Sequence, residues 1–577
     1  MNIERDVMVA SYSIKCLFLA LLVKNYVSAR SYAKEASINE AQVCIPQGKL
    51  QGTTRTTRNN RIVSAFLGIP YAQPPIGNLR FANPVAADGW NGIRNASVDS
   101  NKCPQISNSE IVGDEDCLYL NVYTPQLSRK AISPLLPVMV FIYGGGFDSG
   151  NADSSKYGPE YLLDKDVILV TISYRVGVLG FLSTGDKVAS GNWGLKDQVL
   201  GLKWVQSNIE YFGGDPDQVT LFGQSAGAAS VHLLTMSNLT IGLFHRYITE
   251  SGSALAAWAY KPSGPYADRA FELGKYVGCS NTSTDSLIEC LRTVDVSDMV
   301  ASYPELNHHE WFQTIVWGPT DEPNIKDAVL TDSPQNIIRN GLVHDLPWIS
   351  GACQDGGLLM TVDMYENETL LDDFVANFDR ILPAMLNWNY LPDSGAAWIE
   401  PIKSHYFNDL EADKNEIRDN LTVLVTDVYF LYPTYDALRQ QFSTSVNPQY
   451  FYIFDYRGVL SYTYELTGNT VDYGVTHGDD LVYLFPNSEL FSSLNETRSE
   501  KDYEMVNIMV ELWTSFAIEG KPTTPATGIY EKWKPYSIAK DNNLRIGNYS
   551  KLTLAVQYSY LKKRLQFWDD LIANVPL

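Results

Sequence analysis

Short apolar runs recur along the chain and alternate with segments of helical spacing. Two of them cover residues 138–143 and 167–174, and a segment with one apolar helical face follows at 195–209. Later strand-like runs cover residues 219–224, 246–249, 346–350 and 450–454. Apolar strands separated by helices are typical of a mostly parallel sheet that helices cover on both faces. The pattern therefore predicts an α/β fold.

Two longer stretches, residues 260–319 and 365–447, have a helical pattern. In open α/β sheets, ligands bind beyond the carboxyl ends of the strands. We expect these two stretches to form helical caps over a pocket at that edge.

One strand runs directly into a Gly-x-Ser-x-Gly sequence. Ser225 lies between Gly223 and Gly227, and small residues open a helix immediately afterwards. A serine on a sharp strand-to-helix turn stands clear of the sheet, and glycines on either side tolerate that backbone best. The five residues are weak evidence alone, but their context predicts a nucleophilic serine.

A serine hydroxyl needs a base to remove its proton, and a third group must orient that base. His477 is the candidate base, because it lies in a Gly- and Asp-rich loop downstream of Ser225. This is the order of serine and histidine in α/β-hydrolases. Without Ser225, His477 would be interpreted as an ordinary histidine of a surface loop.

The strand-like run 138–143 ends at three glycines. Residues without a Cβ let backbone N–H groups approach a developing oxyanion closely. The predicted donors are the N–H groups of Gly145, Gly146 and Ala226. A plain tight turn is the alternative interpretation of the three glycines.

The composition is that of an acidic globular protein. The 577 residues carry a formal net charge of −22, which argues against nucleic acid or an anionic membrane surface as a partner. Residues 1–29 have the pattern of a secretory signal peptide, with Lys15, an apolar run at 16–23 and small residues at 27–29. The run is too short to span a bilayer, so we expect a secreted protein without a membrane anchor.

The cysteines fit this expectation. Cys103 lies close to Cys117 in the sequence, and Cys279 lies close to Cys290, so each pair could close a small loop. Buried free thiols are the alternative. Asn-x-Ser/Thr sequences mark surface positions that can carry glycans in a secreted chain. They begin at Asn95, Asn238, Asn281, Asn367, Asn420, Asn495 and Asn548.

Several further motifs resemble, in order and spacing, those of the type-B carboxylesterase/cholinesterase family. They cover residues 66–72, 115–122, 191–198 and 212–227. The resemblance extends over nearly the whole chain after the signal, so it implies a single α/β-hydrolase domain at 30–577. It also implies hydrolysis of carboxylic esters through an acyl-serine, without a metal or other cofactor.

The resemblance assigns roles to individual residues. It implies Ser225 as the nucleophile, His477 as the base, and Ser251 as a serine that hydrogen-bonds near them. The implied oxyanion donors are again Gly145, Gly146 and Ala226. The family's two short-loop disulfides fall on Cys103–Cys117 and Cys279–Cys290.

Two departures from the family pattern concern residues beside the predicted site. Gln224 precedes the serine where most members have glutamate, and in this it resembles the juvenile hormone esterases among the insect enzymes. Tyr143 replaces the histidine that often precedes the three glycines. Because the oxyanion donors are backbone groups, we expect Tyr143 to alter the pocket wall rather than the oxyanion hole.

The third departure concerns the acid that orients the base. The family has Gly-x-x-x-Asp-Glu-Gly, whereas this chain has Gly356 at the position of the glutamate. Asp355 is adjacent and could serve if the loop is one residue shorter. Alternatively, Asp355 keeps its usual family place and faces away from His477. Glu250 also follows a strand, but strand alternation points it away from the side of Ser251.

The sequence thus predicts a secreted serine carboxylesterase that acts on a small hydrophobic ester and is slowed if the acid is displaced or missing. The alternative is a catalytically impaired or inactive cholinesterase-like module for binding or adhesion, which Gly356 favours. An intact nucleophile and base argue for the enzyme.

Overall fold

The computed structural model describes residues 41–127, 134–279, 283–307, 315–388, 395–407, 410, 413–494, 498–523 and 532–574. The predicted signal peptide, residues 1–29, lies outside the described residues. In the parts of the chain that are described, no helix has the length and apolar character needed to cross a membrane.

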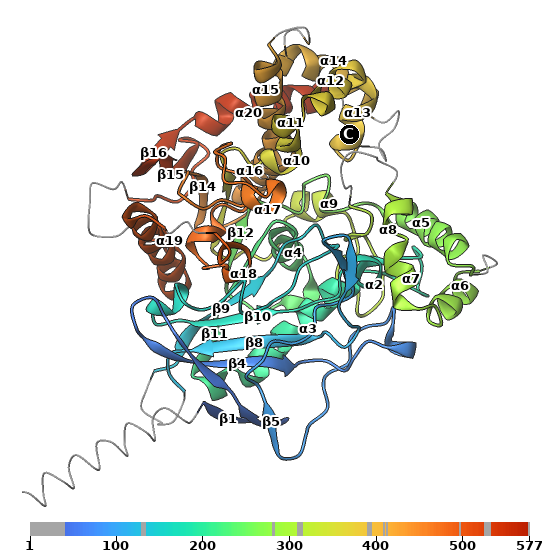
Figure 1. The fold of residues 1–577 in the computed structure, drawn as a ribbon, viewed down its shortest axis with the longest axis vertical. Coiled ribbons are helices and arrows are strands. Elements are labelled where there is room, and N and C mark those ends of the chain that lie inside the picture. Colours follow the sequence, from blue (N-terminus) through green and yellow to red (C-terminus); the bar gives the residue numbers. More distant parts are fainter. Residues whose placement is uncertain are drawn as a thin grey trace, which may run out of the picture.

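A large mixed sheet forms the centre of the molecule (Figure 1). Its strands, in spatial order, are β16 (Lys551–Tyr558), β15 (Asn542–Tyr549), β14 (Gln449–Tyr456), β13 (Trp348–Cys353), β12 (Arg246–Glu250), β11 (Gly214–Gln224), β9 (Leu136–Ile142), β10 (Ile168–Ile172), β8 (Tyr119–Thr124), β4 (Ile62–Pro70) and β3 (Thr53–Thr56). The neighbours from β10 to β15 are parallel, whereas β8, β4, β3 and β16 add antiparallel pairs at the two edges. The predicted mostly parallel α/β sheet is therefore confirmed.

The central strands are buried over nearly their whole length. Every residue of β10, β13 and β14 is buried, which explains why their sequences are almost continuously apolar. Helices α3 (Trp193–Asn208), α4 (Ala226–Leu234) and α19 (Glu500–Glu519) pack against the parallel strands. All strands predicted from the apolar runs are present, within a few residues of their expected bounds.

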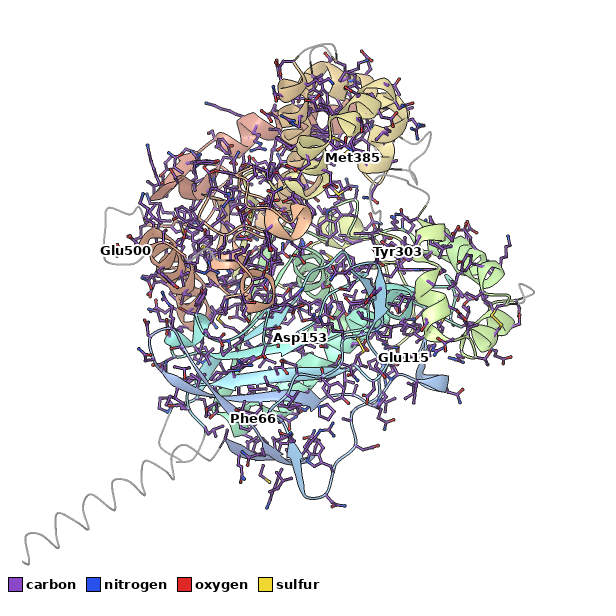
Figure 2. All side chains as sticks on the ribbon, viewed as in Figure 1. Phe66, Glu115, Asp153, Tyr303, Met385 and Glu500 are labelled. Carbon is purple, nitrogen blue, oxygen red and sulfur yellow. A yellow bond between two sulfur atoms is a disulfide. The ribbon has the colours of Figure 1, made fainter. Side chains whose placement is uncertain are left out.

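Two helical groups extend away from the sheet, and they correspond to the two helical stretches predicted from the sequence. The first comprises α5 (Ser263–Tyr276), α6 (Thr284–Leu291), α7 (Val296–Ala301) and α8 (Tyr303–Leu306). The second comprises α10 (Leu358–Thr361), α11 (Asp363–Glu366), α12 (Glu368–Ala376), α13 (Phe378–Met385), α14 (Ala396–Ile402), α15 (Lys414–Thr426) and α16 (Tyr432–Phe442), with π-helical turns η6 (Lys403–Phe407) and η7 (Asp427–Leu431). Figure 2 labels Tyr303 in the first group and Met385 in the second.

Smaller elements complete the chain. The short strands are β1 (Gln42–Ile45), β2 (Gly48–Gln51), β5 (Ile93–Asn95), β6 (Gln105–Ser107) and β7 (Glu110–Val112). The 3₁₀ helices are η1 (Gly77–Leu79), η2 (Leu162–Asp164), η3 (Ile209–Phe212), η4 (Asn238–Thr240) and η8 (Leu481–Tyr483). The other helices are α2 (Gly177–Phe181), α9 (Pro334–Arg339), α17 (Thr463–Thr467), α18 (Ser488–Phe491) and α20 (Tyr560–Asn574). Both predicted disulfides, Cys103–Cys117 and Cys279–Cys290, are formed. Of the other described cysteines, Cys44 is exposed and Cys353 is buried.

Candidate active site

Ser225 lies on a tight turn between β11 and α4. Its φ of 58° and ψ of −125° place it in a region that non-glycine residues rarely adopt. The backbone packs so closely here that a Cβ at Gly227 would lie 2.0 Å from the carbonyl oxygen of Ile142, and a Cβ at Gly223 would lie 2.7 Å from it. Glycine is therefore required on both sides of the serine. Ser225 itself is half-buried, while Gln224 and Ala226 beside it are buried.

The glycine loop after β9 lies directly against this turn. A Cβ at Gly144 would lie 2.8 Å from the Cβ of Ser225. Gly145 and Gly146 have φ values of 107° and 61°, which favour glycine. Within the described residues, the N–H groups of Gly145, Gly146 and Ala226 donate no hydrogen bond. The three groups predicted as oxyanion donors are thus available to a ligand.

Tyr143 does not line this site. It is buried, its ring stacks on that of Tyr174 at 4.4 Å between centroids, and each hydroxyl donates to the main-chain carbonyl of the other residue. The expectation that Tyr143 alters the pocket wall is therefore wrong, because these hydrogen bonds hold the ring within the core.

His477 lies in a loop that two carboxylates hold in place. Asp479 accepts hydrogen bonds from the N–H groups of Thr476 and Tyr462. Asp355 accepts one from the N–H of Val475 at 3.0 Å, and its own N–H donates to the carbonyl oxygen of Val475. Hydrogen bonds to these two carboxylates therefore fix the backbone of Val475 and Thr476, which precede His477.

The two imidazole nitrogens of His477 have different surroundings. Nε2 lies 3.0 Å from Nε2 of Gln224, while Oγ of Ser225 makes no hydrogen bond to another described residue. Nδ1 is buried and has no hydrogen-bond partner in the described part of the chain. Burial disfavours the charged imidazolium and lowers the pKa of His477 to about 3. The imidazole is therefore neutral at physiological pH.

Neither of the two carboxylates considered from the sequence, Asp355 and Glu250, is hydrogen-bonded to His477. Asp355 is bound to Val475 instead, so its predicted role as the acid is not formed in this structure. Burial raises the pKa of Asp355. Gly356 carries no side chain. Glu250 accepts a hydrogen bond from the indole N–H of Trp513 at 2.5 Å, consistent with the expectation that it points elsewhere.

An aromatic ring covers the imidazole. Phe430, in η7, stacks on His477 with 4.3 Å between ring centroids and an angle of 17° between planes. A Cβ at Gly356 would lie 3.0 Å from Cδ2 of Phe430. Sequence reasoning missed Phe430, since nothing in the sequence relates residue 430 to residue 477. The unusual Gly356 was the only available signal.

Ser251 follows β12 and has a φ of 53°. Its hydroxyl is buried and makes no hydrogen bond among the described residues, so the support implied by the family resemblance is not formed here. The described residues also contain no cluster of histidine, cysteine or carboxylate side chains suited to a metal ion.

The predicted glycosylation sites differ in accessibility. Four of the asparagines are exposed: Asn95, Asn238, Asn367 and Asn548. Asn420 is half-buried, and two others, Asn281 and Asn495, lie outside the described residues.

A comparison with known protein families matches residues 39–568 to the Carboxylesterase family. The chain belongs to this family. A juvenile hormone esterase of Tribolium castaneum is 35% identical over 560 residues, covering 92% of this chain and 94% of the relative. Esterase E4 of Myzus persicae is 37% identical over 511 residues, covering 86% and 89%. Venom carboxylesterase-6 of Apis mellifera is 33% identical over 539 residues, covering 91% and 93%.

Membership of the carboxylesterase family confirms the α/β-hydrolase fold and supports carboxylic ester hydrolysis as the reaction class. In this member, the turn at Ser225 lies directly against the glycine loop, and the N–H groups of Gly145, Gly146 and Ala226 donate to no other described residue. The imidazole of His477 contacts Gln224 and stacks on Phe430, and no carboxylate of the described residues is hydrogen-bonded to it.

Proposed function

We propose that this protein is a secreted serine carboxylesterase that turns over small hydrophobic esters slowly. Ser225 attacks the ester carbonyl carbon while His477 takes the hydroxyl proton at Nε2. The N–H groups of Gly145, Gly146 and Ala226 stabilise the tetrahedral oxyanion. The alcohol leaves with that proton, and a water molecule activated by the same imidazole then cleaves the acyl-serine.

The observation that carries this proposal is the strained turn at Ser225, beside which three backbone N–H groups are available as donors. The neutral imidazole of His477 contacts Gln224, the residue before the serine. Backbone strain of about 1–3 kcal/mol at a single residue persists where the surrounding structure enforces it, and such residues concentrate at active sites. The close contacts of Gly223 and Gly227 enforce it here.

Slow turnover follows from the surroundings of His477. The imidazole must become positively charged as it removes the serine proton, and no described carboxylate is hydrogen-bonded to Nδ1. In a serine protease, replacing the carboxylate that contacts the histidine lowers kcat by about 10⁴-fold, and the remaining groups still accelerate the reaction by about 10³–10⁴ over water. We expect this chain to retain catalysis of that residual order.

The substrate class rests on the aromatic rings near the site. Phe147 follows the glycine loop, Trp258 lies 6.4 Å from it between centroids, and Phe430 lies 6.4 Å from Trp258. These rings are buried, so they make the surroundings of the site apolar, which favours uncharged, hydrophobic ligands. Secretion is supported by the two disulfides, which are typical of oxidising compartments.

Labelling with a fluorophosphonate probe tests the nucleophile, and short p-nitrophenyl esters test turnover. We expect Ser225 to be labelled, and p-nitrophenyl butyrate to be hydrolysed with a low kcat that Ser225→Ala abolishes. The matched control is Ser253→Ala, which removes a nearby buried serine hydroxyl that contacts Pro433 rather than the site. Equal labelling of wild type and Ser225→Ala would reject the proposal.

A second candidate function is a hydrophobic-ester-binding protein without turnover. The pairing of Nε2 of His477 with Gln224 favours it, because this nitrogen must accept the serine proton for hydrolysis. Binding of an intact ester with the same affinity by wild type and Ser225→Ala, without release of alcohol from either, would establish this function instead.

A further inference from the structure

Two adjacent glycines allow a helix to approach the loop after β13 unusually closely. A Cβ at Gly357 would lie 2.2 Å from the carbonyl oxygen of Thr422, in α15. The N–H of Gly357 donates to the hydroxyl of Thr426 at 2.8 Å, which ties the loop to the same helix. Any side chain at position 357 would force this helix away.

This close approach brings η7, which continues α15, over the imidazole. The turn is anchored by Asp427, which accepts hydrogen bonds from Arg564 at 2.8 Å and Tyr406 at 2.9 Å. The carbonyl of Tyr429 accepts a hydrogen bond from the indole of Trp258 at 3.0 Å. Phe430 is 1% exposed, so its ring is enclosed on all sides. Single π-helical turns inside α-helices, as η7 is between α15 and α16, frequently lie at functional sites.

Gly356 leaves room for that ring. A Cβ built at position 356 would point at Phe430, 3.0 Å from Cδ2 and 3.3 Å from Cε2. These distances are shorter than ordinary van der Waals contact, so even alanine requires the ring to shift. A side chain at position 356 would therefore press on the ring that stacks on His477.

We propose that Phe430 is a positioning residue that holds the His477 imidazole by stacking, in place of a side chain at position 356. This inference rests on the proposed function, since a position for the base matters only if His477 acts as one. The ring fixes the plane of the imidazole and keeps water from it, but supplies no counter-charge. The imidazole is therefore held in place in its neutral form, and the stack on Phe430 adds little stability to the protonated form.

The first experiment does not depend on activity. His477 is observed by NMR in protein carrying ¹³C-labelled histidine, with its signal assigned from His477→Gln. Phe430→Leu removes the ring and keeps an apolar side chain, so the signal should shift and the pKa of His477 should rise. Phe430→Tyr keeps the ring and should reproduce the wild-type signal and titration. An unchanged His477 signal and pKa in Phe430→Leu would overturn the proposal.

A double-mutant cycle tests the relation between positions 356 and 430. Gly356→Ala should displace the ring and shift the His477 signal in the wild-type background, but should have no effect in Phe430→Leu. Equal shifts in both backgrounds would overturn the proposal. Because this readout needs no substrate, the cycle stays informative if the esterase proposal fails.

The kinetic test uses p-nitrophenyl butyrate. Phe430→Leu should lower kcat by about tenfold or more with little change in KM, and Phe430→Tyr should stay within about threefold of wild type. In Phe430→Ala the space beside His477 opens, so adding Gly356→Glu should then raise kcat at least tenfold and move the acid limb of the pH profile upward. Equal kcat and pH profiles in Phe430→Ala and the double variant, both folded, would contradict the proposal that Phe430 takes the place of a side chain at position 356.

Discussion

The side-chain nitrogen of Gln224 lies 3.0 Å from Nε2 of His477, on the nitrogen that a serine hydrolase uses to accept the proton of its nucleophile. A neutral imidazole with its proton on Nδ1 can accept a hydrogen bond from the Gln224 amide at this nitrogen. That is also the protonation form a general base requires. The contact thus favours this tautomer while it occupies the nitrogen that would take the Ser225 proton in the proposed mechanism.

Replacing Gln224 with glutamate tests this contact through the pH dependence of activity. A carboxylate within about 4–6 Å of an imidazole stabilises its protonated form and raises its pKa by about 1–3 units. The acid limb of kcat/KM should therefore lie higher in Gln224→Glu than in wild type, where burial holds the pKa of His477 at about 3. The limb should not move in Gln224→Leu, which changes the contact without adding charge. Coinciding pH profiles for Gln224→Glu and wild type would show that the two side chains are not adjacent.

Asp355 should contribute to stability more than to catalysis. It accepts a hydrogen bond from Val475 and makes none with His477. Asp355→Asn keeps an acceptor at this position, so we expect kcat to change less than about threefold. Asp355→Ala leaves the Val475 N–H without its partner and should lower the free energy of unfolding by about 1–3 kcal/mol, measured by urea denaturation. A loss of kcat of about 10⁴-fold in Asp355→Asn would instead identify Asp355 as the acid.

The burial of His477 predicts a pH dependence of stability. Its pKa is about 3 in the folded state and about 6.5 in the unfolded chain, so between these values only the unfolded state binds the proton. The free energy of unfolding should therefore fall with decreasing pH, by up to about 1.4 kcal/mol per pH unit from this residue. Asp479, whose pKa burial raises to about 7, acts in the opposite direction, so the comparison must be between variants.

Urea denaturation of wild type and His477→Gln between pH 6.5 and about 4 gives the required difference. The variant should lose less stability on acidification, so the free energy of unfolding of His477→Gln minus that of wild type should rise as the pH falls. His405→Gln is the control, because His405 is exposed and should change the slope much less. Parallel stability curves for wild type and His477→Gln would contradict a neutral, buried His477.

The Cys103–Cys117 disulfide should stabilise the fold measurably. It closes a loop with a sequence separation of 14 residues, and loops of this size gain about 3 kcal/mol from cross-linking. Replacing both cysteines with serine should lower the free energy of unfolding by that order and lower Tm accordingly. Cys44→Ser, at an exposed free cysteine, should leave both quantities unchanged. An equal loss in the two variants would mean that the effect does not come from the disulfide.

Much of the site could be predicted because its features are local in the sequence. Ser225 lies in a tight turn that needs glycine two residues away on either side, and Gly145 and Gly146 adopt backbone conformations that favour glycine. Because residues close in the sequence meet these conformational requirements, the requirements can be recognised as a sequence motif. The surroundings of His477 are different, since its contacts come from residues 224 and 430, far away along the chain.

By itself, the sequence determined the α/β sheet, the serine on its turn, the glycine loop and the pairing of four cysteines, because apolar periodicity, glycine spacing and family motifs all act over short segments. It also showed Gly356 at the position where the family has its acid, but it did not show which residues contact His477 instead. Only the tertiary structure decided that Asp355 binds the backbone of Val475, that Gln224 meets Nε2 of His477, and that Phe430 covers the ring. These contacts depend on how closely α15 and η7 pack on the loop after β13, and that distance is set by two glycines together with the packing of the whole helical group.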